Sequence, residues 1–180
     1  MPSPDLRPAA DRLAGLLPAI SDDQLDAPTP CGDWTVRDVL QHAVELTGAF
    51  TAAAVKKAPD VQLDGLPDDW RERLPRQLGE LAGAWDDPAA WDGECEAGGV
   101  TLPSRIMGVV ALDEIVVHGW DLAVSTGQAP DVRDEDAHAC LGFAANADGV
   151  FGPALPVADD APVLHRLLGA TGRSADWSPA

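Results

Sequence analysis

The sequence is poor in basic residues, and this shortage narrows the range of possible functions. Its 180 residues include 12 Lys and Arg against 30 Asp and Glu, which gives a formal net charge of −18 at pH 7. Such an excess of negative charge repels the phosphate groups of nucleic acids and of anionic membranes. We therefore expect neither a nucleic-acid partner nor a membrane partner.

Cysteine is also scarce, and Cys31, Cys95 and Cys140 are widely spaced. They form no CxxC pair, and the absence of a disulfide framework is typical of a reducing compartment. The N-terminal stretch lacks the basic region and apolar core of a signal peptide. No apolar run approaches the length of about 18 residues that crosses a bilayer. These absences predict a cytoplasmic protein.

Apolar residues make up 46% of the chain and recur at helical spacing in several stretches. This pattern predicts an all-α fold, a four-helix bundle with short additional helices. We expect residues 1–180 to form one domain, with the C-terminal segment 152–180 packing on the bundle. The expected helices cover residues 5–20, 35–55, 68–84, 102–127, 134–151 and 162–169. Thr35 and Asp38 resemble a capping box for the second helix, and Gly98-Gly99 marks a turn.

The stretch of residues 102–127 is apolar on almost every side of the predicted helix. Its polar residues include four at spacings of 4, 3 and 4, which place them on one helical face: Glu114, His118, Asp121 and Ser125. One interpretation is that the helix is buried and this row is its only solvent-exposed edge. The other is that the row faces inward, where Glu114 and His118 bind a metal ion with a third ligand from elsewhere.

Several other polar residues also allow two interpretations. His42 lies at the edge of an apolar helical face, where a lone histidine is more often a packed residue, but it is the possible third donor. Asp121 either orients an imidazole or is an exposed carboxylate. Trp34 and Trp120 could line a pocket mouth, although core packing is the favoured role. Cys31 has no base adjacent in the sequence and is interpreted as structural.

Segments along most of the chain resemble a known superfamily. They are TPCGDWTVRDVLQH (29–42), EIVVHGWDLAVSTGQ (114–128), FGPALPV (151–157) and LLGATGRSADW (167–177). These segments are similar to the DinB-like superfamily. More narrowly, they resemble short actinobacterial metal-binding proteins related to the N-terminal domain of mycothiol-dependent maleylpyruvate isomerase. The resemblance implies a four-helix bundle that holds a divalent metal, usually zinc, through two histidines and a carboxylate. Matched residue by residue, these ligands fall on His42, Glu114 and His118.

The implied ligand set suggests a chemistry. Two histidines and one carboxylate leave coordination positions open, as catalytic zinc sites do, although nickel, iron or manganese also fit. A metal there would activate a thiolate or a water molecule. We therefore expect a metal-dependent thiol S-transferase or isomerase with mycothiol as cosubstrate, a small electrophile as partner and a homodimeric state. The isomerase itself has a further C-terminal domain, for which 180 residues leave little room, so its particular activity is not inferred.

Two other functions stay open at this point. The first alternative is a non-catalytic protein that binds or senses a small ligand through the metal. The second is a packing or dimerisation module that holds no metal. No general acid, substrate-selecting residue or cofactor-binding residue can be identified from the sequence, so catalytic residues beyond the ligands remain unassigned.

Overall fold

The computed structural model describes residues 3–57, 63–147 and 150–179. Its elements are α1 (Arg7–Leu16), η1 (Leu17–Ala19), η2 (Asp22–Gln24), α2 (Val36–Ala54), α3 (Trp70–Trp85), η3 (Pro88–Trp91), β1 (Glu94–Ala97), β2 (Val100–Pro103), α4 (Ser104–Ser125), α5 (Asp134–Ala144) and α6 (Val163–Ala170). The predicted all-α class is confirmed, with one small antiparallel hairpin added around the predicted turn at Gly98-Gly99.

The first four α-helices share one hydrophobic core. Both α1 and α2 pack against both α3 and α4, so each of these four helices contacts two of the others. The core contains leucines that are almost completely buried, among them Leu13, Leu40, Leu78 and Leu112, one from each helix. Because all four helices contribute an apolar stripe, their packing removes those stripes from water together.

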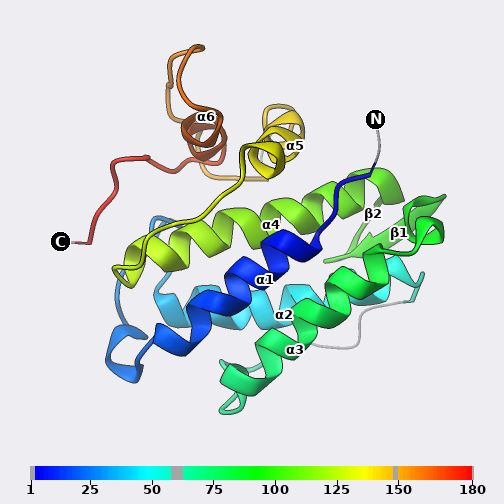
Figure 1. The fold of residues 1–180 in the computed structure, drawn as a ribbon, viewed down its shortest axis with the longest axis horizontal. Helices are drawn as coiled ribbons and strands as arrows, with labels where there is room; N and C mark the ends of the chain where they lie inside the picture. The colour runs from blue at the N-terminus through cyan, green and yellow to red at the C-terminus, as the bar shows by residue number, and fades with distance from the viewer. Residues whose placement is uncertain (1–2, 58–62, 148–149, 180) are drawn as a thin grey trace.

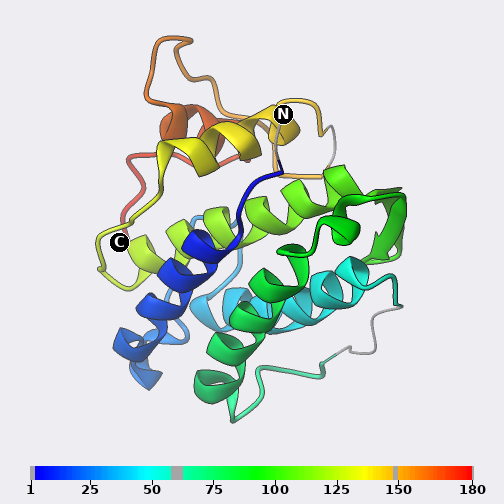
Figure 2. The ribbon, with the colours of Figure 1, turned by 45° about the vertical axis from the view of Figure 1, so that its right-hand side comes forward.

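A second layer covers the opposite side of α4. Here α5 packs on α4 and α6 packs on α5, on the side away from α2 and α3 (Figures 1 and 2). The helix α4 therefore lies between two layers, which explains why it is apolar almost all round. No helix among the described residues is both long and apolar enough to cross a membrane.

The predicted capping box at the start of α2 is present and fixes the loop before it. The carboxylate Oδ2 of Asp38 accepts hydrogen bonds from the backbone N–H and Oγ1 of Thr35, at 2.8 and 2.6 Å. Within the preceding loop, Thr29 Oγ1 donates to the carbonyl of Trp34 at 2.8 Å and accepts from the N–H of Cys31 at 3.2 Å. These bonds hold Cys31 and Trp34 in place beside the first turns of α2.

The predicted helix over residues 134–151 is too long. The helix α5 ends at Ala144, where the side-chain amide of Asn146 donates to the carbonyl of Gly142 at 3.1 Å. Asparagine often ends a helix in this way, because its amide satisfies a carbonyl that the helix leaves open. Residues 148–149 of the predicted helix lie outside the described residues.

Candidate metal centre

The polar row of α4 faces inward. His118 is 6% exposed, Asp121 0% and Ser125 6%, while the side chain of Glu114 keeps 19% of its surface. The interpretation of this row as the solvent-exposed edge of the helix is therefore wrong. The reason is tertiary, since α2 covers one flank of α4 and the C-terminal residues cover another.

The three residues predicted as metal ligands come together between α2 and α4. His42 Nε2 lies 3.4 Å from Glu114 Oε2, and His118 Nε2 lies 3.2 Å from the same oxygen. One ligand atom from each residue lies within 4.8 Å of the other two. Two imidazole nitrogens and one carboxylate oxygen at this spacing fit the donor chemistry of a divalent metal such as zinc. That these residues bind a metal remains a prediction.

The charges in this cluster are strongly coupled. Burial alone would raise the pKa of Glu114, but the hydrogen bonds with His118 and His42 hold it well below its usual range. Burial alone would lower the pKa of His118, but the hydrogen bonds to Asp121 and Glu114 raise it to about 9. In the metal-free protein at neutral pH, the positive charge of the buried His118 imidazolium therefore compensates the negative charges of Glu114 and Asp121. A bound metal cation would replace this positive charge.

Asp121 orients the imidazole of His118. Its Oδ2 lies 3.0 Å from His118 Nδ1 and also accepts a hydrogen bond from Arg173 Nη2 at 3.0 Å. Because Nδ1 is directed at this carboxylate, Nε2 is the nitrogen that faces Glu114, and it would bind a metal once its own proton has left. Of the two interpretations of Asp121, the orienting role thus matches the geometry, and the exposed carboxylate does not.

Arg173 is a site residue to which the sequence reasoning assigned no role. It is 6% exposed, and its Nη1 donates to the carbonyl of Thr171 at 2.7 Å. Burial alone would lower its pKa, but the charge of Asp121 raises it, so the guanidinium stays charged. The only signal in the sequence was the resemblance of the segment 167–177, since no spacing along the chain links Arg173 to α4.

A cavity of about 250 Å³ opens beside the three donors and is called the inner cavity below. Its other walls come from the loop before α2, from α4 and from the C-terminal residues: Cys31, Trp34, Asp113, Val117, Val150, Phe151, Gly152 and Arg173. A cavity that combines apolar walls with a few converging polar groups is typical of a ligand site.

Trp34 and Cys31 both line this cavity, and for Trp34 this differs from the core packing favoured from the sequence. Trp34 is 37% exposed, and its ring lies 4.9 Å from the ring of His42 and 6.0 Å from that of His118. Core packing is therefore wrong for Trp34, although it holds for Trp120, which is 3% exposed. Cys31 is half-buried, and its sulfur groups with donor atoms of His118 and Asp121 within 4.8 Å. Burial raises the pKa of the Cys31 thiol, so the free thiol stays protonated.

Asp113 is a second site residue that the sequence reasoning missed. It is 1% exposed, and its Oδ1 has no hydrogen-bond partner among the described residues. Burial, together with the neighbouring charge of Glu114, raises the pKa of Asp113 to about 8. Asp113 stands next to Glu114 inside an apolar run, but it lies off the row formed by Glu114, His118, Asp121 and Ser125, so no role was assigned to it.

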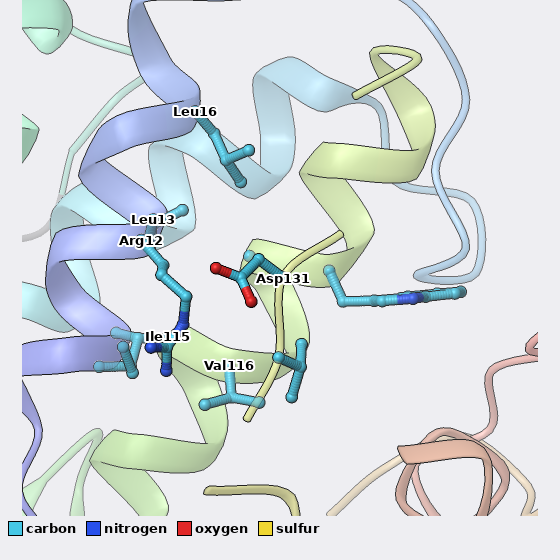
Figure 3. Close-up of a pocket in the computed structure, with 10 residues that line it drawn as sticks. Arg12, Leu13, Leu16, Ile115, Val116 and Asp131 are labelled. Carbon is cyan, nitrogen blue, oxygen red and sulfur yellow. The ribbon is translucent and has the colours of Figure 1, made fainter. Parts of the chain in front are cut away.

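Another cavity lies between α1 and α4, but it is too small for a substrate. Figure 3 shows Leu13, Leu16, Ile115 and Val116 around it, together with the charged residues Arg12 and Asp131. Its volume of about 30 Å³ suits little more than a water molecule. The inner cavity is therefore the better candidate for chemistry.

Comparison with known proteins places this chain in a family. Residues 6–123 match the family described as the mycothiol maleylpyruvate isomerase N-terminal domain. The chain is also 32% identical, over 162 residues, to two uncharacterized proteins from two strains of Mycobacterium tuberculosis, covering 86% of this chain and 84% of theirs. The chain belongs to the mycothiol maleylpyruvate isomerase N-terminal domain family, which is consistent with the DinB-like superfamily.

Solved structures show the same fold. Crystal structures of the mycothiol-dependent maleylpyruvate isomerase and of a histidine-to-alanine mutant match with TM-scores of 0.52 and 0.53 at 17% identity. The match covers 78% of this chain and 65% of the isomerase chain, so this chain spans less than two thirds of that protein's length. At this identity the likeness establishes the fold and leaves the activity open.

Proposed function

We propose that this protein is a metal-dependent thiol S-transferase or isomerase that uses mycothiol. The observation that supports the proposal is the convergence of His42, Glu114 and His118 on the inner cavity, with ligand atoms within 4.8 Å of one another. The name of the family adds mycothiol as the thiol. Zinc is the metal proposed first, and nickel is the second choice, because the same donors suit both.

The three ligands would hold the metal, and their open arrangement leaves room for a further group beside them. When bound, a divalent metal supplies the positive charge that stabilises a thiolate or hydroxide near neutral pH. Glu114 suits this role because its pKa lies well below its usual range, so it is ionised over the whole physiological pH range. The two imidazoles are neutral ligands, so the metal keeps a net positive charge toward the incoming thiol.

The residues around the ligands would set their orientation. Asp121 holds the proton of His118 at Nδ1, which keeps Nε2 available as a donor. Arg173 holds Asp121 through two hydrogen bonds, at 3.0 and 3.4 Å. This chain of contacts is buried from α4 to the C-terminal residues, and buried, fully paired groups of this kind keep a site preorganised.

The apolar walls would exclude water from the reacting groups. Val117 and Phe151 line the inner cavity, and Trp34 lies over both histidine rings at its mouth. Exclusion of water strengthens the electrostatic interactions inside a site and prevents hydrolysis of reactive groups. A small apolar electrophile suits these walls. An anionic group on the electrophile would suit Arg173, which also lines the inner cavity.

A conjugation assay tests the proposal. Zinc-loaded protein is incubated with mycothiol and a chromogenic aryl halide, and loss of both reactants is followed against protein-free buffer. We expect catalysed consumption that is lost in His42→Ala and retained in His138→Ala, because His138 is exposed on α5. If neither reactant is consumed while mycothiol still binds saturably, the transferase is refuted and the non-catalytic binding protein takes its place.

A further inference from the structure

A groove that shares Trp34 and His42 with the inner cavity lies along α2. This outer groove has a volume of about 350 Å³ and is lined by Trp34, Asp38, Gln41, His42 and Glu45. Trp34 and His42 line both spaces. The outer groove therefore borders the candidate metal centre at His42.

The lining of the outer groove follows from the register of α2. Asp38, Gln41, His42 and Glu45 are spaced by three, one and three residues, which places them on one face of the helix. The same face that presents His42 to α4 thus carries two carboxylates and an amide outward along the groove. These polar side chains lie outside the apolar stripe of α2, so they do not contribute to the packing of the core.

The polar groups of the outer groove are held in place and keep free acceptor atoms. Gln41 Nε2 donates to Glu45 Oε1 at 3.3 Å and to the carbonyl of Leu63 at 3.2 Å, and Glu45 Oε1 also accepts from the N–H of Leu63. The cap at Thr35 uses Oδ2 of Asp38. The second oxygen of Asp38, the amide oxygen of Gln41 and the second oxygen of Glu45 accept no hydrogen bond from any described residue.

These acceptors define the ligand chemistry. Ionised carboxylates accept hydrogen bonds and donate none, so a ligand must bring hydroxyl or N–H donors. Arg37, the neighbouring basic residue, pairs with Asp26 at 3.2 Å instead, which leaves the groove acidic. An acidic ligand would be repelled there. The partly exposed indole of Trp34 adds an apolar surface for the C–H groups of a ring.

We propose that the outer groove is the subsite for the hydroxyl-rich end of the thiol, whose sulfur passes Trp34 and His42 to reach the metal centre. The inner cavity, with Arg173 and its apolar walls, is then left for the electrophile. The inference rests on the proposed function and narrows it, since it selects neutral polyhydroxylated thiols over acidic ones. Mycothiol, a cysteine-derived thiol on a sugar-like scaffold, belongs to the first class, and glutathione, with two carboxylates, belongs to the second.

Calorimetric binding to the zinc-loaded protein tests the subsite with three thiols. Mycothiol carries the hydroxyl-rich end, N-acetylcysteamine is neutral and lacks it, and glutathione is acidic. We expect Gln41→Ala/Glu45→Ala to bind mycothiol at least about tenfold more weakly, the loss expected for hydrogen bonds to a charged group. The affinity for N-acetylcysteamine and the zinc content should not change. The control variant Glu80→Ala, on the exposed surface of α3, should bind all three thiols as the wild type does.

A conservative variant guards against a folding defect, because Glu45 also holds the backbone of Leu63. Glu45→Gln keeps the shape and removes the charge, so it should narrow the preference for mycothiol over glutathione. If thiols bind but mycothiol binds no better than N-acetylcysteamine, or Gln41→Ala/Glu45→Ala binds it as the wild type does, the outer groove is refuted and the proposed function stands. If zinc is held and no thiol binds, the proposed function fails and the subsite with it.

Discussion

Replacing the buried Asp113 with asparagine should increasingly stabilise the metal-free protein relative to the wild type as the pH rises. Asp113 is 1% exposed, and its Oδ1 has no hydrogen-bond partner in the described part of the chain. Burial therefore favours its neutral form and raises its pKa to about 8. In the unfolded chain the carboxyl ionises near its ordinary pKa of about 4. Between these two values the folded state binds one proton more than the unfolded state, so stability falls as the pH increases.

The magnitude follows from proton linkage. A full proton difference changes the free energy of unfolding by about 1.4 kcal/mol per pH unit, or roughly 3 kcal/mol between pH 5 and pH 7. Asparagine cannot ionise, so Asp113→Asn lacks this penalty, and any cost of its buried amide is the same at both pH values. The titration of His118 is present in both proteins and largely cancels in the comparison.

Urea denaturation of EDTA-treated wild type and Asp113→Asn at pH 5, 6 and 7 measures this difference. The stability of the variant relative to the wild type should rise by roughly 3 kcal/mol over this range. Asp159→Asn, which changes an exposed carboxyl, should show no such trend. A stability difference that stays constant from pH 5 to pH 7 would refute the assignment of a neutral, buried Asp113.

Three further outcomes are expected. The pKa of His118 is raised to about 9, so zinc must displace a proton from this residue when it binds. A competition titration should therefore show the zinc affinity rising about tenfold per pH unit between pH 6 and pH 8. A flat profile would argue against ligation by His118. In the same titration, Asp121→Asn should bind zinc about 10- to 100-fold more weakly than the wild type, with the same helical content. An unchanged zinc affinity would show that Asp121 does not orient His118. Gly108→Ala should lower the free energy of unfolding by about 1–3 kcal/mol, because an added Cβ would lie 2.4 Å from the ring of Trp91. Urea denaturation measures this change, and a variant as stable as the wild type would contradict the packing.

Local patterns predicted most of the helical framework. The Thr35–Asp38 capping box, the apolar periodicity of α2 and the turn at Gly98-Gly99 all follow from short-range chemistry, and all three are present. The end of α5 was misplaced, because the amide of Asn146 competes with the helix in a way that apolar periodicity does not register. The homodimeric state stays a prediction.

The candidate site could be predicted only in part. The spacing of Glu114 and His118 along one helix placed both on the same face. His42 from α2 was the possible third donor, and the resemblance implied that it is a ligand. The roles of Arg173 and Trp34 depend on tertiary packing, which brings the C-terminal residues and the loop before α2 against α4. Contacts of this kind join residues far apart in the chain, and helical periodicity carries no information about them.

Metal content tests the central claim most directly. Tag-free wild type, His42→Ala and His138→Ala are incubated with zinc, desalted and analysed by mass spectrometry for metal per chain. We expect about one zinc per chain in the wild type and in His138→Ala, and none in His42→Ala, because two protein donors are too few to retain the ion. Zinc absent from the wild type, or held equally well by His42→Ala, would contradict the metal centre formed by His42, Glu114 and His118.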